Sequence, residues 1–188
     1  MPAALLRSGR NELTLERVGG TSRVFYSMQL RQVVGMEEIP AIAPSNITVE
    51  REYLRILPRR VGDNTQASET APTGNRLAQG DRVLVRLTIT APEDVAYALI
   101  EDPFPSGMEV TERGTAEIDE WSAWWANTDI RDDRIAFFVR SMPKGKHVIE
   151  YNLRAQTPGT FHALPTVLQG MYAPQTRGES AGARVVIK

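Results

Sequence analysis

The fold is decided by the stretch Arg134-Ile-Ala-Phe-Phe-Val-Arg140 and by the run that follows it, Gly145-Lys-His-Val-Ile-Glu-Tyr-Asn-Leu-Arg-Ala155. In both runs the residues alternate between two sets, and a period of two places alternate side chains on opposite faces of a strand. Pro143-Lys-Gly145 supplies typical turn residues between the runs. The two runs are therefore predicted to form a β-hairpin.

Working outward from this hairpin, further strands are predicted wherever apolar residues alternate or β-branched residues cluster. Residues 58–80 are polar and contain several glycines and prolines, which predicts a long loop. Residues 117–127 are predicted to form one short helix. The sum is an all-β, antiparallel β-sandwich of about seven strands with one short helix. The strands predicted outside the central hairpin are residues 47–57, 83–89, 97–101 and 183–187, with a brief pairing at 108–112.

The first part of the chain is predicted to be separate from the sandwich. Residues 12–18 and 24–34 alternate like two strands around Gly19-Gly20, so residues 1–36 are predicted to form a β-hairpin. Residues 37–46 are expected to be a linker, and residues 47–188 the sandwich domain. A lone hairpin is marginal in water. It is therefore expected to be the end of an upstream domain or an edge added to another sheet, and in the isolated chain to be docked on the sandwich or poorly ordered.

Composition excludes several classes of function. The chain has 188 residues, of which 41% are hydrophobic and 24% charged, with a net charge of −1. Balanced charge does not favour nucleic acid or an anionic membrane as partner. No apolar run approaches the roughly 20 residues that span a bilayer, and the first residues do not form a signal peptide. Cysteine is absent, which removes disulfides, thiolate nucleophiles and cysteine-ligated zinc.

The candidates for catalysis or metal binding are weak. His147 and His162 are the only histidines, and without a local carboxylate cluster they are expected to be strand residues rather than metal ligands. Asp132 and Asp133, between two arginines, and the pair Glu101-Asp102 are interpreted as solvated turns. Motifs for phosphate or dinucleotide binding and for a nucleophile elbow are absent. No cofactor is expected, and a small hydrolase is the weakest of the functional hypotheses.

Two groups of residues are candidates for binding. Trp121, Trp124 and Trp125 have the spacing that places three indoles on one helical face, where they could bind a glycan or peptide or cap the core. Met171 and Tyr172 lie in a loop bounded by glycine and proline. A large apolar pair in such a loop is predicted either to be structural or to contact another domain, a role that suits tyrosine well.

Six short motifs occur in order over the last 110 or so residues. They are Gln79-Gly-Asp81 before an alternating strand, Ile100-Glu-Asp-Pro-Phe-Pro-Ser-Gly107, Arg131-Asp-Asp-Arg134, Tyr151-Asn-Leu-Arg-Ala155, Thr157-Pro-Gly-Thr-Phe161 and Met171-Tyr-Ala-Pro174. In this order they resemble the C-terminal macroglobulin domain of bacterial α2-macroglobulins. The early residues Ser8-Gly-Arg-Asn11 and Phe25-Tyr-Ser27 are similar to the closing strands of the family's CUB-like domain, and Ile47-Thr-Val-Glu-Arg-Glu-Tyr53 is similar to the first strand of its terminal domain.

The resemblance implies a macroglobulin-type sandwich in a non-enzymatic, periplasmic protease trap. In that family a protease cuts a bait region, the molecule rearranges, and an exposed Cys–Gln thioester attaches to the attacker. The terminal domain packs over the thioester in the resting state, and a Met-Tyr loop that matches Met171-Tyr172 helps to shield it. The implied partner is the thioester domain, with proteases engaged only through the full-length protein.

This sequence departs from the complete family pattern because it has no cysteine, hence no thioester, and no bait region. It is expected to be the last part of a longer protein, a truncated reading frame or one subunit of a split system, and inhibition by this chain alone is not expected. The alternative is an independent β-sandwich module that binds a glycan or peptide through the tryptophan face.

Overall fold

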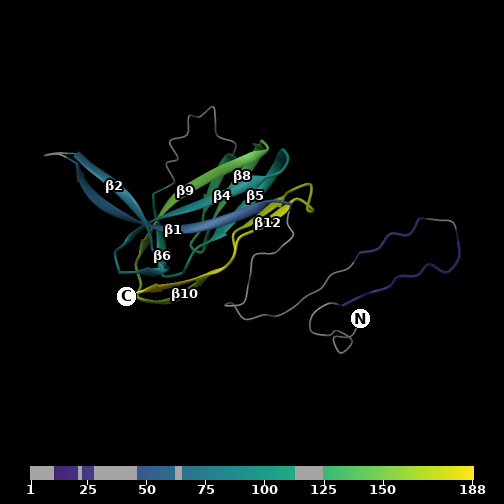
Figure 1. Cartoon of the computed structure of the whole chain (residues 1–188), viewed down its shortest axis with the longest axis horizontal. Helices are drawn as coiled ribbons and strands as arrows, with labels where there is room; N and C mark the ends of the chain where they lie inside the picture. Colours follow the sequence, from purple (N-terminus) through teal and green to yellow (C-terminus); the bar gives the residue numbers. More distant parts are fainter. Residues whose placement is uncertain (1–10, 21–22, 28–45, 62–64, 113–124) are drawn as a thin grey trace. The chain divides into compact units, whose positions relative to one another are not determined.

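The computed structural model describes residues 11–20, 23–27, 46–61, 65–112 and 125–188 (Figure 1). The chain divides into two units, residues 1–33 and 34–188.

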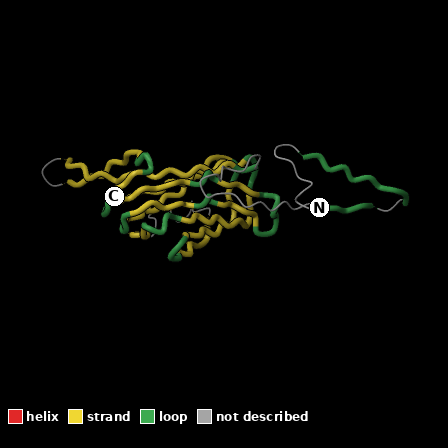
Figure 2. The backbone as a smooth tube through the Cα atoms, turned by 90° about the horizontal axis from the view of Figure 1, so that it is seen from below, coloured by secondary structure: helices red, strands yellow, loops and turns green. Residues whose placement is uncertain are grey.

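The second unit is built from two five-stranded antiparallel sheets and one small three-stranded sheet. Figure 2 shows their strands lying side by side. The first sheet has the order β2-β1-β4-β9-β6, the second β12-β11-β5-β8-β7, and the small one β10-β13-β3. The chain passes repeatedly between the two large sheets, as it does in sandwich folds. The strands are β1 (Thr48–Val61), β2 (Thr65–Pro72), β3 (Arg76–Leu77), β4 (Arg82–Ala91), β5 (Val95–Pro103), β6 (Met108–Glu112), β7 (Trp125–Ile130), β8 (Arg134–Met142), β9 (Gly145–Ala155), β10 (Gly159–Ala163), β11 (Val167–Gly170), β12 (Arg177–Glu179) and β13 (Ala183–Ile187).

One apolar core joins the three sheets. The alternating faces of β4 and β9 in the first sheet and of β5 and β8 in the second supply most of its fully buried side chains. Leu87 in β4 is typical: it pairs with Arg51 on one side and Ile149 on the other, and no part of it is exposed. The all-β, antiparallel sandwich predicted from alternation is therefore confirmed.

The sandwich is closed along one side by a close approach of β12 to the start of β1. A Cβ atom at Gly178 would lie 2.6 Å from the carbonyl oxygen of Ile47, so only glycine fits there without a shift of the backbone. The backbone N–H of Arg177 also donates to the side chain of Asn46 at 3.3 Å. These contacts join an edge of the second sheet to a strand of the first.

The prediction of a long loop over residues 58–80 is wrong for the described residues. Strand β1 continues to Val61, and β2 returns from Thr65 to Pro72 in register with it. Hydrogen bonding to a neighbouring strand forms a ribbon here although the sequence lacks the apolar alternation of a core strand. Together with four short strands of two to five residues, β3, β10, β11 and β12, this ribbon explains why the described ranges contain more strands than the seven expected.

The predicted short helix at 117–127 is wrong where it can be judged. Residues 113–124, including Trp121 and Trp124, lie outside the described residues. Trp125 and Asn127 belong to β7 and pair with Val139 and Phe138 of β8. Pairing with a long central strand overrides the helical spacing of the indoles. No helix occurs in the described ranges, and hence none there has the length and apolarity to cross a bilayer.

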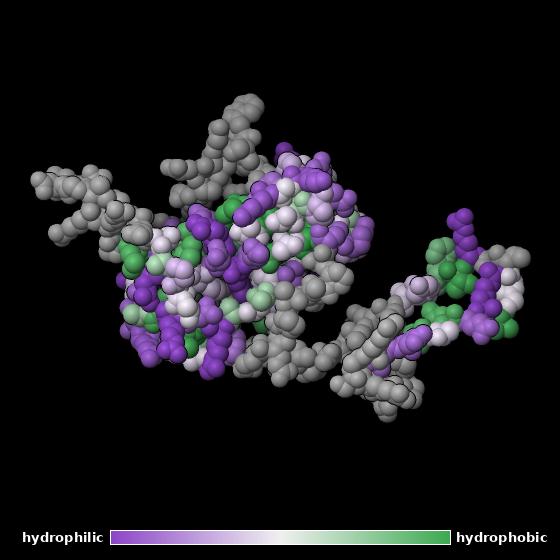
Figure 3. Space-filling view, in the orientation of Figure 1, coloured by the Kyte–Doolittle hydropathy of each residue, from purple (hydrophilic) through white to green (hydrophobic). Residues whose placement is uncertain are grey.

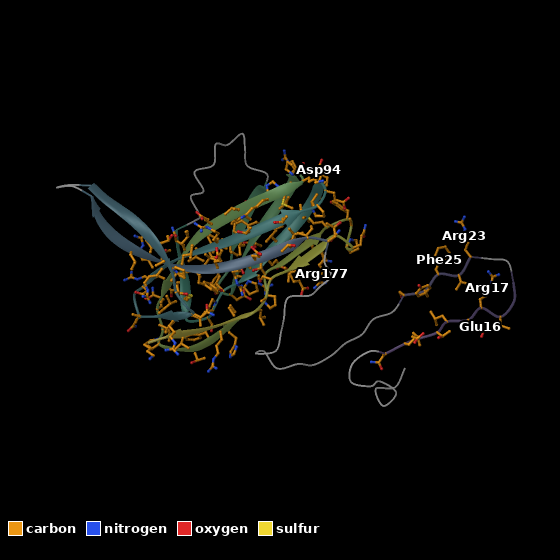
Figure 4. The ribbon with its side chains drawn as sticks, viewed as in Figure 1. Glu16, Arg17, Arg23, Phe25, Asp94 and Arg177 are labelled. Atoms are coloured by element: carbon orange, nitrogen blue, oxygen red, sulfur yellow. The ribbon has the colours of Figure 1, made fainter. Side chains whose placement is uncertain are left out.

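The first unit is described over residues 11–20 and 23–27, and those residues contain no strand. The strand predicted at 12–18 is therefore wrong, as is the part of the second strand at 24–27. Apolar side chains there are exposed, with green hydrophobic patches in Figure 3 and Phe25 projecting outward in Figure 4. A two-stranded ribbon with no layer over its apolar face gains little from burial, which accounts for the difference. The boundaries at 36 and 46 stay predictions.

Replacing Leu87 by alanine tests whether the shared core holds the sheets together. The substitution Leu87→Ala should lower the free energy of unfolding by about 2–5 kcal/mol, because it leaves a cavity among fully buried side chains. Val148→Ala on the neighbouring strand is the matched control, since Val148 is exposed, and it should change stability by less than about 0.5 kcal/mol. Chemical denaturation measures both, and equal effects would contradict this placement of the core.

Candidate functional site

The loop between β11 and β12 carries the two residues that sequence analysis selected, and it is tightly braced. Thr176 N–H donates to the carbonyl of Ala173, and Gly170 N–H donates to the carbonyl of Thr176, both at 2.8 Å. A Cβ atom at Gly170 would lie 2.6 Å from the Ala173 oxygen, so the turn closes directly over this glycine. The loop thus has a defined backbone conformation, which a merely solvated connection does not need.

Met171 and Tyr172 are presented to solvent by this loop. Their side chains are 52% and 82% exposed. Figure 3 shows that the visible face of the sandwich is mainly hydrophilic, with hydrophobic residues in small separate patches. A thioether beside a phenol ring, held outward by a braced turn, can act as a contact surface.

Tyr97, at the start of β5, is a neighbour of this loop that sequence reasoning missed. Its carbonyl accepts the N–H of Met171 at 2.7 Å, and its ring meets that of Tyr172 edge to face, with centroids 5.6 Å apart. Asp94, which immediately precedes β5, and Arg177, which begins β12, are labelled in Figure 4 toward the right-hand end of the sandwich. The site therefore consists of Tyr97, Met171 and Tyr172, which we name the aromatic lid.

A second cluster lies inside the sandwich and was also missed. Arg51 Nη1 donates to Oδ1 of Asp102 at 2.6 Å, and the two side chains are 1% and 0% exposed. The hydroxyls of Tyr151 and Thr166 donate to the same carboxylate at 2.6 and 2.8 Å. Arg51 also donates to the carbonyls of Pro103 and Ala163. The interpretation of Glu101-Asp102 as a solvated turn is thus wrong for Asp102, because its charge is paired and fully enclosed.

Burial sets the protonation of the groups around this carboxylate. Desolvation, reinforced by the negative charge of Asp102, holds the pKa of Tyr151 well above its ordinary value. Desolvation likewise raises the pKa of Tyr53, although the positive charge of Arg51 opposes the shift. For Arg51 itself burial is the largest influence and acts to lower the pKa, but the charge of Asp102, its hydrogen bond to Arg51 and the nearby Tyr53 and Tyr151 together outweigh burial, and the pKa is raised. The cluster is thus a buried ion pair beside two phenols whose pKa values are raised, and its two charged side chains are enclosed in the sandwich.

The other candidates do not converge. Asp133 is exposed and pairs with Arg134, which also reaches Glu101 at 3.2 Å, as expected of a solvated turn. His147 lies in β9 and contacts the Pro143 carbonyl, whereas His162 lies in β10 of the small sheet. Among the residues that the structure describes, no three histidines or carboxylates are grouped as metal ligands would be. The side chains of Trp121, Trp124 and Trp125 are not described.

The sequence of this chain is similar to those of known proteins. Residues 47–175 match the family described as the bacterial α2-macroglobulin MG10 domain. An α2-macroglobulin homologue of Nostoc is 25% identical over 199 residues, covering 100% of this chain and 10% of its own. A circularly permutated Ras protein 2 of Dictyostelium discoideum is 25% identical over 182 residues, covering 95% of this chain and 4% of its own. The chain thus spans a tenth or less of the length of these relatives.

Solved structures show the same fold. Two crystal structures of Salmonella α2-macroglobulin, one of a tyrosine-to-glycine mutant and one of the protein reacted with methylamine, each match with a TM-score of 0.63 and 27% identity. Each match covers 81% of this chain and 10% of the Salmonella chain.

The buried cluster leads to a prediction at alkaline pH. A tyrosine whose pKa is raised on folding keeps its stability below the ordinary value of about 10, and stability falls as the pH rises from there toward the folded value. Unfolding free energy should therefore fall above about pH 10, and Tyr151→Phe should reduce that slope by about 1.4 kcal/mol per pH unit. At neutral pH the same variant should lose about 1–3 kcal/mol, because Asp102 loses a donor.

Denaturation at a series of pH values measures both effects. Tyr172→Phe is the control, since it removes an exposed phenol and leaves the cluster intact. If Tyr151→Phe lost stability with pH as steeply as the parent protein above pH 10, Tyr151 would not be the source of the alkaline effect.

Proposed function

Because the chain belongs to the bacterial α2-macroglobulin MG10 domain family, we propose that it is the non-enzymatic domain that covers the thioester of a bacterial α2-macroglobulin-type protease inhibitor. In this proposal the aromatic lid packs against the thioester domain and leaves it when a protease triggers the conformational change. The periplasm is the compartment that this role implies. The observation that carries the proposal is the exposed Met171–Tyr172 pair on a braced loop of a family domain.

The physical demand on such a cover is to exclude water and amines. A thioester is an acylating group, and it survives only while nucleophiles are kept away from its carbonyl. Tyr172 supplies a flat apolar ring, and Met171 supplies a flexible, polarisable side chain that adapts to an irregular surface. Neither side chain brings a carboxylate, an ammonium or a guanidinium group that would need solvating at a closed interface.

The geometry of the loop fits a cover that releases as a unit. Its bracing bonds, from Gly170 to Thr176 and from Thr176 to Ala173, are internal, and the Met171 N–H donates to the Tyr97 carbonyl of β5. An interface built on a preorganised loop avoids the cost of ordering it at each docking. The domain can therefore separate from a partner without refolding the lid.

The test is the reactivity of the thioester in the α2-macroglobulin assembly that contains this chain. Tyr172→Gly should raise the rate of methylamine-induced thiol release by about 10–30-fold, since losing an aromatic anchor at an interface costs about 1.4–2 kcal/mol. Thiol titration over time measures the rate. Val148→Ala, exposed on the other large sheet, is the matched control and should leave the rate unchanged. Equal rates for Tyr172→Gly and the parent protein would sink the shielding role.

A further inference from the structure

Tyr97 has a backbone conformation that its residue type disfavours. Its φ is 51°, and the only other non-glycine residue with positive φ in the described ranges is Asn75. Asparagine is enriched in this left-handed region, whereas a bulky aromatic residue there is uncommon. Such a conformation costs on the order of 1–2 kcal/mol and persists only where the surroundings impose it. A retained cost of this kind indicates a role for the residue that occupies it.

The conformation reverses which residues of β5 face outward. From Ala98 onward every second residue is buried, yet Ala96 and Tyr97 are two consecutive exposed residues between buried Val95 and buried Ala98. The partner strand β8 changes at the same place, with Arg140 and Ser141 exposed between buried Val139 and Met142. The register is kept, because Ala96 pairs with Ser141 and Ala98 with Val139 on either side. The local distortion thus turns Tyr97 out of the core without shifting the sheet.

Tyr97 makes two contacts with the other residues of the aromatic lid, one to Met171 and one to Tyr172. Its backbone carbonyl accepts the Met171 N–H at 2.7 Å, which continues the ladder between β5 and β11 by one residue. Its ring packs edge to face on Tyr172 with an interplanar angle of 79°, an arrangement favoured by the charge distribution of aromatic rings. Tyr172 is 82% exposed, and within the described residues its ring packs against the ring of Tyr97.

We propose that Tyr97 is the positioning residue of the aromatic lid: its left-handed backbone and its ring together fix the direction in which Met171 and Tyr172 face their partner. The proposal rests on the proposed function, because it names what orients the same contact surface. Tyr97 is itself 53% exposed, so it also extends the apolar surface offered to the thioester domain.

The test separates the ring of Tyr97 from its backbone. Tyr97→Gly and Tyr97→Asn both tolerate the left-handed conformation but lack the ring, whereas Tyr97→Phe keeps the ring. In the 188-residue chain, NMR should show the Tyr172 ring signals moving toward those of a free tyrosine in the glycine and asparagine variants, and returning to the parental positions in Tyr97→Phe. The unfolding free energy of Tyr97→Gly should not fall. Moved Tyr172 signals together with unchanged stability would distinguish a positioning residue from one that only supports the fold.

The second arm measures methylamine-induced thiol release in the assembly. Loss of one aromatic pair should raise the rate about 2–10-fold in Tyr97→Gly, and Tyr97→Phe should restore it. Unmoved Tyr172 signals in both ring-less variants overturn the positioning role, as does an acceleration confined to Tyr172→Gly. If the signals move but Tyr172→Gly itself leaves the release rate unchanged, the positioning of Tyr172 is supported and the shielding function is the part that fails.

Discussion

The enclosed ion pair between Arg51 and Asp102 is the constraint on which the sandwich depends. Removing two charges from water is costly, and a buried pair offsets that cost only when its geometry is good and further hydrogen bonds complete it. Here Tyr151 and Thr166 complete the carboxylate, and two backbone carbonyls help to complete the guanidinium. The participants come from β1 and β9 of the first sheet, from β5 and the entrance of β11 in the second, and from β10 of the small sheet. Any slip of one sheet against another would leave a charge unpaired in the core.

This network also determines where the aromatic lid lies. Asp102 is near one end of β5, and Thr166 immediately precedes β11. With both held to the same carboxylate cluster, the pairing of Glu101 with Val167 and of Ala98 with Gly170 follows along the ladder. The next positions along these strands are Tyr97 and Met171. The lid is thus attached to two strands that the buried charges hold in register, which is how an exposed loop far from the ion pair acquires a fixed position.

Alternation in the sequence was sufficient to predict the sandwich and its central strands. In β4, β8 and β9 buried positions largely alternate with more exposed ones, and the buried positions carry apolar residues that can be recognised in the sequence. Alternation was not sufficient for Asp102, since Glu-Asp-Pro-Phe-Pro is typical of a turn and the arginine that neutralises the aspartate lies 51 residues earlier. Sequence analysis also missed Tyr97, because its φ of 51° is imposed by neighbouring residues and cannot be read from the pattern of apolar and polar residues. Sequence reasoning selected Met171 and Tyr172 because they are large apolar residues in a glycine- and proline-bounded loop, and the structure shows both exposed there, while their role stays a prediction.

The aromatic lid runs against what stability alone would select. Folding gains from burying a methionine and two tyrosines, yet the chain holds all three in water and maintains a disfavoured backbone conformation at Tyr97 to do so. Gly170 adds a further restriction, since a side chain at that position would collide with the turn. Each of these features lowers the gain from folding, and all of them lie in the aromatic lid or in the loop that carries it. Stability alone does not account for these features, and their coincidence supports the proposal that a partner covers this surface.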